Sequence, residues 1–436
     1  MRDLAATAEA LLAGCRGDEE AEVYGLHRVV TRVETSTGGE LRQVSRAETL
    51  GVGLRLVIDG AAGARTGYAS TTDLGDDGLG TALTAARAAA VTASPDPADR
   101  LPEPRRLPSP GVPGLPTGTD VDAGVRTAVE LARAGGSLDP RVRTVDLASW
   151  REECSEVSIV STRGVRVRHG RRTVEIELAV VGEGADGSAT GYAGRCDDAD
   201  DVAALAAEAV AGAVALLGPR RELPPGLPVL LSPDVTATLL TALGRTLTGP
   251  ALDGAGPFRG PLGTSLASEA VTLDDDGPSP LAAPAGPFDD EGQPRQVTRL
   301  LDRGRLVGAL HTSATAPPGT PSTGSARRGS HRSLPGVGPT LLRLTPTVEL
   351  PAAAAVLVHQ LSGEGAGIRP VTGRVDVGLV ACLLDDGVPA GRLPILPLST
   401  TFGELWSRVV AVSENGRAVP GFPVVAPTVM IRPGLL

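Results

Sequence analysis

The chain has 436 residues, of which 41 % are hydrophobic, 2 % aromatic and 21 % charged. This length predicts two domains, or three small ones, and the net charge of −10 argues against a nucleic-acid backbone as the main partner. All 41 basic residues are arginine, which excludes phosphate loops, Schiff-base sites and Ser-x-x-Lys nucleophiles, because each of these requires a lysine.

Residues 4–12 have their leucines on one face of a predicted helix, and the acidic residues Asp3 and Glu9 argue against a signal peptide. No apolar stretch approaches the roughly 18 residues of a membrane-spanning helix. The four cysteines lie far apart and form no Cys-x-x-Cys pair, which favours thiols in a reducing compartment. The sequence therefore predicts a cytoplasmic protein without a membrane partner.

An internal repeat organises the first half of the chain. Thr66–Ser70 reads Thr-Gly-Tyr-Ala-Ser, and Thr190–Gly194 reads Thr-Gly-Tyr-Ala-Gly, an offset of 124 residues (190 minus 66). Alternating strand patterns precede both motifs, and an alanine-rich helical pattern follows each. The helical faces are predicted to be Leu79, Ala82, Leu83, Ala86 and Ala90 in the first copy, and Val202, Leu205, Ala206, Ala209 and Ala213 in the second.

These patterns predict an α+β fold class for an N-terminal domain over residues 1–222. Its two units, of helix, antiparallel strands and helix, cover about residues 1–93 and 119–218, and a proline-rich linker over residues 94–118 joins them. We expect the two units to cover each other's apolar sheet faces and so to form one pseudo-symmetric domain.

Residues 226–436 predict a second, β-rich domain. Short apolar runs separated by Gly, Pro and Asp turns indicate a mostly antiparallel barrel or sandwich. Helical patterns occur at residues 235–248 and at Thr401–Val409, and residues 312–340 form a long polar loop.

A search for chemistry finds no self-sufficient active site. No two of the five histidines have metal-ligand spacing, and no Gly-x-Ser-x-Gly elbow occurs. The acidic run at residues 274–276 reads as a solvated turn. The remaining candidates for an independent hydrolase, with or without a metal, are His311, His331, Asp289 and Glu291.

Several segments in order resemble the TldD/PmbA family over nearly the whole chain. They are Gly51-Val-Gly-Leu-Arg55 with Ala64-Arg-Thr-Gly-Tyr68, Leu262–Ser268 before Val271–Asp275, Phe288–Pro294 with Thr298–Leu306, and the tail Gly421-Phe-Pro with Ala426-Pro-Thr428. In that family, TldD-type subunits carry a His-Glu-x-x-x-His zinc-protease helix and a metal-binding cysteine near the C-terminus. TldE (PmbA)-type partners keep the scaffold without the metal.

The resemblance implies that this chain is of the TldE type. Leu240 and Arg245 stand where the two histidines would be, and Thr241 stands where the glutamate would be. Leucine cannot bind zinc, arginine stays charged, and no base is left to activate a metal-bound water. Cys382 lies some fifty residues before the C-terminus with no obvious ligand neighbour.

The resemblance therefore implies no catalytic residue, no metal site and no cofactor in this chain, and zinc in a TldD-like peptidase partner. The pair would process unfolded peptides, including leader peptides of ribosomally made natural products, held here as an added strand. Asp289, Glu291, Gly292 and His311 are the candidates for lining the peptide channel. Two alternatives stay open: a self-standing hydrolase, and a peptide-binding scaffold that acts as a homodimer.

Overall fold

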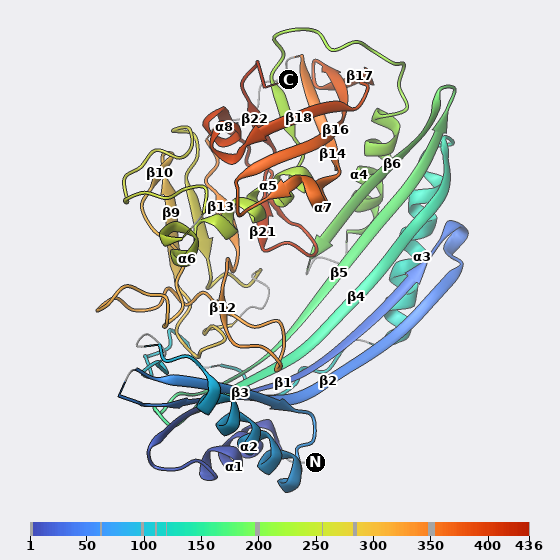
Figure 1. The fold of residues 1–436 in the computed structure, drawn as a ribbon. Helices are drawn as coiled ribbons and strands as arrows, with labels where there is room; N and C mark the ends of the chain where they lie inside the picture. The colour runs from blue at the N-terminus through green and yellow to red at the C-terminus, as the bar shows by residue number, and fades with distance from the viewer. Residues whose placement is uncertain are drawn as a thin grey trace.

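The computed structural model describes residues 3–61, 63–96, 100–109, 111–118, 120–196, 201–254, 256–281, 286–347 and 354–435. The chain has an α+β fold, with a long curved sheet in the first half and a strand-rich second half packed above it (Figure 1). Both the α+β class and the strand-rich second half are as the sequence predicts. None of the described helices is long and apolar enough to cross a membrane.

The first half repeats one order of elements: helix, two long strands, a shorter strand and a second helix. The first copy is α1 (Leu4–Ala13), β1 (Glu19–Thr35), β2 (Leu41–Ile58), β3 (Arg65–Thr71) and α2 (Asp76–Thr92), with a short 3-10 turn at Thr37–Gly39 between β1 and β2. The second copy is α3 (Val121–Ser137), β4 (Val142–Ser161), β5 (Arg166–Gly184), β6 (Gly187–Cys196) and α4 (Val202–Ala215). The predicted apolar faces of α2 and α4 are buried, which confirms the helical periodicity.

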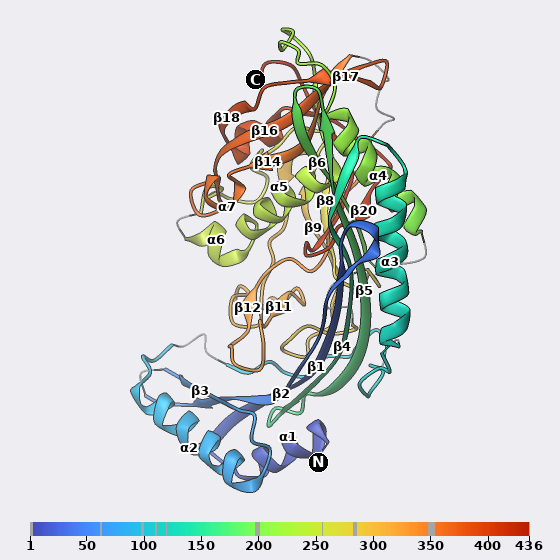
Figure 2. The same cartoon turned by 90° about the vertical axis from the view of Figure 1, so that its right-hand side faces the viewer.

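The two copies join edge to edge, and the expectation that they cover each other's faces is wrong. Their strands form one antiparallel sheet in the order β3-β2-β1-β4-β5-β6, and β1 pairs with β4 from Glu22 opposite Ser161 to Thr35 opposite Ala148. Each unit alone would leave a long row of unpaired backbone groups on β1 or β4, and pairing the two edges satisfies them. The apolar faces are covered instead by α1 and α2 at one end and by α3 and α4 at the other (Figure 2).

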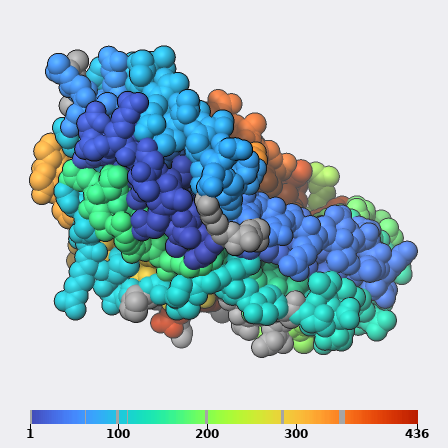
Figure 3. Space-filling view, turned by 90° about the horizontal axis from the view of Figure 1, so that it is seen from below, coloured from blue at the N-terminus to red at the C-terminus, as the bar shows by residue number. Residues whose placement is uncertain are grey.

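Both glycines of the repeated motif are required by close packing of a helix on a strand. A Cβ atom at Gly67 would lie 1.9 Å from the carbonyl oxygen of Ala86 in α2, and one at Gly191 would lie 1.9 Å from that of Ala209 in α4. The repeated Thr-Gly-Tyr-Ala sequence therefore marks the same helix-on-strand contact twice. Seen from below, the surface belongs mainly to residues of this first half (Figure 3).

The second half contains short strands and helices arranged in two main sheets and a small ribbon. The elements are β7 (Val229–Leu231), α5 (Pro233–Thr246), α6 (Gly249–Asp253), β8 (Leu273–Asp276), β9 (Val297–Asp302), β10 (Arg305–Leu306), β11 (Ala326–Arg327), β12 (Gly336–Val337), β13 (Leu342–Leu344), β14 (Ala355–Ser362), α7 (Glu364–Gly367), β15 (Ile368–Arg369), β16 (Arg374–Asp385), β17 (Val388–Arg392), β18 (Leu396–Thr401), α8 (Phe402–Ser407), β19 (Val409–Val412), β20 (Arg417–Ala418), β21 (Val424–Ala426) and β22 (Val429–Ile431).

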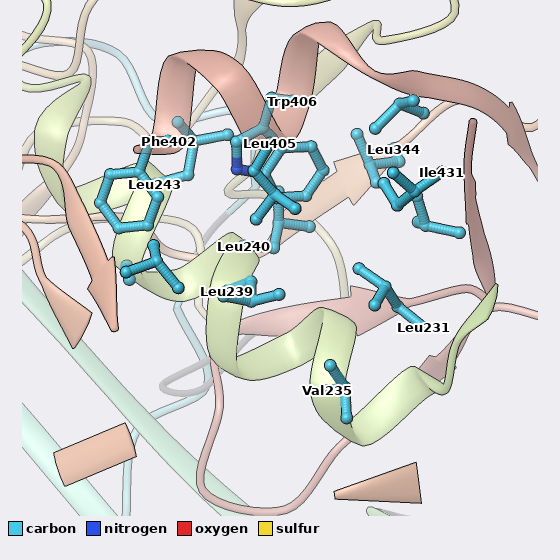
Figure 4. Close-up of a cluster of buried hydrophobic side chains, with 14 of the residues drawn as sticks. Leu231, Val235, Leu239, Leu240, Leu243, Leu344, Phe402, Leu405, Trp406 and Ile431 are labelled. Atoms are coloured by element: carbon cyan, nitrogen blue, oxygen red, sulfur yellow. The ribbon is translucent and has the colours of Figure 1, made fainter. Parts of the chain in front are cut away.

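One sheet has the order β10-β9-β8-β13-β21-β20. The other has the order β15-β16-β14-β7-β22-β19, with β17 and β18 also paired to β16. Most pairs are antiparallel, as predicted, whereas β13 with β21 and β14 with β7 are parallel. Side chains from both sheets share one apolar core around α5 (Figure 4). The sequence of α5 is apolar around much of the helix circumference, and the helix is therefore buried on nearly all sides.

Candidate functional site

The helix α5 has a capping residue at its N-terminus and charged residues at both ends that match the helix dipole. The Ser232 hydroxyl accepts a hydrogen bond from the backbone N–H of Val235, and Pro233 occupies the first turn, where a missing N–H costs nothing. Asp234 lies at the positive end of the helix dipole and Arg245 at the negative end. The helix is thus well specified by its own sequence.

The three residues at the metal positions of the resemblance have three different environments. Leu240 is fully buried and lies among Leu239, Leu405 and Trp406 (Figure 4). Thr241 is buried, and its hydroxyl has no hydrogen-bond partner in the described structure. Arg245 is exposed. An apolar side chain in a packed core, a hydroxyl and an exposed cation do not fit a zinc ion, which takes nitrogen, sulfur or carboxylate ligands.

Cys382 lies in β16, away from α5, and is paired with a histidine. Its Sγ is 3.4 Å from Nε2 of His359 in β14. Burial raises the pKa of the Cys382 thiol to about 11 and lowers the pKa of His359 to about 4, so the pair is neutral at pH 7. Across the described chain, no group of three or more His, Cys, Asp or Glu side chains could hold a metal ion.

Asp289, a predicted channel residue, is used to build a turn. One carboxylate oxygen accepts backbone N–H groups of Glu291 and Gln293, each at 2.9 Å, and the other accepts the N–H of Ala326 at 3.0 Å. Complete burial, and after it the neighbouring Glu291 carboxylate, raise the pKa of Asp289 to about 7 against the lowering effect of the backbone donors. The side chain is 0 % exposed, so it faces no channel in this structure.

Glu291 and Gly292 belong to the same turn and link it to the long sheet. The Glu291 carboxylate accepts the N–H of Ser313 at 2.8 Å and lies 3.5 Å from Nη1 of Arg55 on β2. Burial raises the pKa of Glu291, and Glu22 of β1 raises it further. Gly292 has φ 74°, and a Cβ atom there would lie 2.5 Å from Val165, so glycine is required by both conformation and packing.

His311 and His331 lie in two different environments. A Cβ atom at Gly249, at the start of α6, would lie 2.1 Å from Cε1 of His311, whose Nδ1 is 2.7 Å from the carbonyl oxygen of Thr315. His331 is buried against Gly51 of β2, and neither ring nitrogen has a hydrogen-bond partner among the described residues. Burial lowers the pKa of His331, so the imidazole is neutral at pH 7.

Beside these candidates, a buried ionic network that was not predicted from the sequence joins the two halves of the chain. Arg328 forms an ion pair with Glu22, and the exposed fractions of the two side chains are 0 % and 1 %. The guanidinium also lies 4.9 Å from the ring centre of Tyr24, and the backbone N–H of Arg328 donates to Asp290 at 2.7 Å. The residues 289–293 and 326–331 therefore anchor the C-terminal half on β1 and β2.

A cavity of about 540 Å³ lies at the other end of the sheet, between the second repeat unit and the C-terminal half. Its walls come from β6, α4, the first turns of α5 and β14, and they include Tyr192, Glu208, Gly212, Asp234, Thr238 and His359. Sequence reasoning missed this cavity as a site. The one signal pointing to it was the repeated tyrosine motif, which places Tyr192 on its wall.

Carboxylates and arginines meet beside this cavity. The Arg417 side chain donates to Glu208 at 2.9 Å and to Oδ2 of Asp234 at 2.8 Å, and Arg195 also pairs with Glu208. The other carboxylate oxygen of Asp234, Oδ1, is buried and has no partner in the described structure. Burial raises the pKa of Asp234, and the charge of Arg417 opposes this.

Comparison with known proteins gives a consistent result along the chain. Three family models match: PmbA/TldA metallopeptidase domain 1 at residues 21–90, the central domain at 115–217 and the C-terminal domain at 225–433. The Metalloprotease TldD homolog of Buchnera aphidicola is 28 % identical over 268 residues, which are 58 % of this chain and 52 % of that protein. The chain thus spans about half the length of this curated relative.

Two solved structures share the fold over their whole lengths. The crystal structure of TldE from Thermococcus kodakarensis has a TM-score of 0.82 at 20 % identity and covers 99 % of this chain and 98 % of its own. A structure from Thermotoga maritima has a TM-score of 0.84 at 19 % identity and covers 98 % of each chain. The sequence resemblance, the three matched domain models and the shared architecture agree, and the chain belongs to the PmbA/TldD family of metallopeptidase-related proteins.

Proposed function

We propose that this chain is the metal-free, TldE-like subunit of a TldD/TldE-type peptidase. The observation that supports the proposal is the lack of zinc ligands on α5. The family fold surrounds this helix, but Leu240 lies in the core and Arg245 is exposed to solvent. In this proposal the chain pairs with a zinc-bearing TldD-like subunit, which supplies the metal-activated water. The cytoplasmic location stays a prediction.

The role proposed for this chain is to hold unfolded peptide, and the edge of β6 supports it. β6 has a strand neighbour on one side, β5. The carbonyl of Thr190 accepts from Gln360 and that of Gly194 accepts from Arg417, so both point away from β5. Because alternate residues of an antiparallel strand face the same edge, the N–H and C=O of Tyr192 also point there, beside the cavity. An extended peptide can add to this edge at Tyr192, between these two occupied carbonyls, through backbone hydrogen bonds.

The test is reconstitution with a TldD-type subunit that carries His-Glu-x-x-x-His. The chain alone, with zinc added to the buffer, should leave an unstructured reporter peptide intact. The mixture should form a stable complex by native mass spectrometry and cleave the peptide. Cleavage by the chain alone at a rate comparable to the mixture contradicts the proposal. A homodimer that binds peptide and ignores the zinc subunit favours the scaffold alternative.

The hydrolase alternative finds less support in the geometry. Asp289 and Glu291 are bound to backbone N–H groups, and His331 is buried against Gly51. If the chain alone shows hydrolase activity, His311→Ala and His331→Ala distinguish a self-standing hydrolase from a non-catalytic subunit. Loss of that activity in a variant that stays folded by circular dichroism supports the hydrolase.

A further inference from the structure

The long sheet has an open edge along the first half of β2, at residues 42–50 (Figure 1). The strand neighbour of β2 on that side is β3, and it pairs with Val52–Ile58. Among the described residues, no hydrogen bond reaches a backbone group of residues 42–50 from outside the pairing with β1. Leu41 and Val44 are 51 % and 45 % exposed. Every second residue of this open edge therefore has a backbone N–H and C=O that point away from the sheet without a partner strand.

The equivalent edge in the second repeat unit is covered. At the offset of 124 residues (168 minus 44), Val44–Arg46 correspond to Arg168–Gly170 of β5. The neighbouring strand β6 pairs with β5 only from Glu175 onward, so it leaves this stretch free, as β3 does on β2. Here, however, the backbone N–H of Gly170 donates to the carbonyl oxygen of Val112 at 2.6 Å. A segment of the linker thus occupies the edge of the second unit, and no described segment occupies the edge of the first.

The open edge is positively charged, although the net charge of the chain is −10. Arg42 and Arg46 are exposed, and neither forms an ion pair with a residue that the structure describes. The Arg42 guanidinium donates to a backbone carbonyl, that of Asp146, at 2.7 Å. Glu48, the one acidic residue among residues 42–50, already lies 2.7 Å from Nε2 of His27. The charge of the two arginines is therefore available to a bound segment.

A groove of about 750 Å³ continues this charged surface. Its walls are the turn that precedes β2 and the outer side of α3, and the two are in close contact, because a Cβ atom at Gly39 would lie 2.9 Å from Val129. The exposed Arg126 and Arg133 of α3 line the groove against one carboxylate, Glu130. Cations beside unpaired backbone groups favour a strand that carries carboxylates, because opposite charges on adjacent strands attract.

We propose that residues 42–50 of β2 bind an extended acidic segment of a partner protein, which adds to the sheet as a further strand. The backbone of the segment pairs with the open edge, and two carboxylates four residues apart face Arg42 and Arg46. An apolar side chain midway between them packs on Val44. This edge and the edge of β6 are at opposite sides of the sheet, so the proposal does not depend on the peptide-holding role of β6.

The test is calorimetric titration of the purified chain with three blocked peptides, acetyl-Thr-Thr-X-Thr-Val-Thr-X-Thr-Thr-amide, in which X is glutamate, glutamine or lysine. The glutamate peptide should bind about fivefold more tightly than the glutamine peptide, because each exposed ion pair between strands contributes modestly. The lysine peptide should bind more weakly than both. Added salt should narrow the preference for glutamate.

A charge reversal assigns the effect to the open edge. Arg46→Glu should reverse the order, so that the lysine peptide binds more tightly than the glutamate peptide. The matched control is Arg305→Glu on β10, because Arg305 is also exposed on a strand and also donates to a backbone carbonyl, that of Gly263 at 3.1 Å. This control should keep the preference for glutamate. A preference that Arg46→Glu leaves unchanged overturns the proposed site.

Methylated peptides distinguish strand addition from simple attraction of charges. Two versions of the glutamate peptide carry N-methyl groups on alternate residues, one on the odd and one on the even positions. Because alternate N–H groups of a strand point to the same side, one version should lose binding and the other should keep it. Equal effects of the two versions overturn strand addition. If no peptide binds, the proposal is wrong, and the arginines serve only to protect an exposed edge from aggregation.

Discussion

The two repeat units present the same Thr-Gly-Tyr-Ala motif to the C-terminal half, and the C-terminal half meets them differently. In the first unit, the Tyr68 hydroxyl donates to the carbonyl oxygen of His331 at 2.7 Å, so a loop fills the space beside the tyrosine. In the second unit, the Tyr192 hydroxyl donates to Glu177 at 2.7 Å, and a cavity remains beside the strand edge.

A pair of positions on the strand before each motif accounts for the difference. The first unit has Gly51 and Gly53, and at the same offset of 124 residues (175 minus 51) the second unit has Glu175 and Glu177. A Cβ atom at Gly53 would lie 2.3 Å from the carbonyl oxygen of His331. The two glycines therefore make room for the loop. At the equivalent positions, Glu177 accepts from the Tyr192 hydroxyl and Glu175 pairs with Arg151.

The comparison shows how the charged groups are paired at the two contacts between the halves. Around the first unit, Glu22, Asp289 and Asp290 all receive donors from the chain itself. Around the second unit, Arg417 pairs with Glu208 and Asp234, two carboxylates that line a cavity. The duplicated fold thus makes one filled contact between the halves and one contact that leaves a cavity.

The largest expected effect on stability comes from removing the buried ion pair between Arg328 and Glu22 at the first unit. Arg328→Met leaves Glu22 charged and buried, which should lower the free energy of unfolding by about 3–5 kcal/mol in urea denaturation. The control is Arg343→Met, whose ion pair with Asp276 is partly exposed (48 % and 21 %), and this variant should cost less than about 1 kcal/mol. Equal losses for the two variants contradict a structural role for the network.

The second largest loss of stability is expected from a larger side chain at Gly53, where the loop that contains His331 packs on β2. Gly53→Ala should lower the free energy of unfolding by about 2–3 kcal/mol, because the new methyl group overlaps the Tyr68 hydroxyl and the backbone of His331. Gly17→Ala, with no atom within 4 Å of the added Cβ, should leave stability almost unchanged. A neutral Gly53→Ala would show that the loop docks for another reason.

The lowered pKa of His359, which lines the cavity, predicts that the stability of the fold decreases as the pH falls. The pKa of His359 is about 4 in the folded protein and near 6.5 when unfolded, so between these values the unfolded chain binds a proton that the folded chain does not. Stability from this group is present above pH 6.5 and lost as the pH falls towards 4. The stability gap between the wild type and His359→Gln should therefore narrow by about 2 kcal/mol from pH 7.5 to pH 4.5 in urea titrations. A gap that is constant with pH contradicts this.

The smallest loss of stability is expected at Glu177, which stands in the second unit where the first unit has Gly53. Glu177→Ala removes the acceptor of the Tyr192 hydroxyl and should cost about 1 kcal/mol of unfolding free energy, less than Gly53→Ala. Glu183→Ala, at an exposed position, is the control and should be within about 0.5 kcal/mol of the wild type. A larger loss for Glu177→Ala than for Gly53→Ala would reverse the ranking of the two contacts.

The periodicity of the sequence was sufficient for the elements of the first half but not for their assembly. The faces of α2 and α4 follow from apolar spacing, because a helix buries the same side wherever it packs. The pairing of β1 with β4 depends on hydrogen bonds between backbones more than a hundred residues apart, which leave no local pattern. The face-to-face expectation failed for that reason.

The candidate residues show the same division. The sequence alone identified the family and the residue types at Leu240, Thr241 and Arg245, because zinc coordination depends on side-chain chemistry that can be read from single letters. It could not tell that Asp289 lies inside a turn, or that Asp234, Glu208 and His359 share one cavity wall. Burial and convergence of residues distant in the chain arise from packing, so only the tertiary structure decided which carboxylates are bonded inside a turn and which line a cavity.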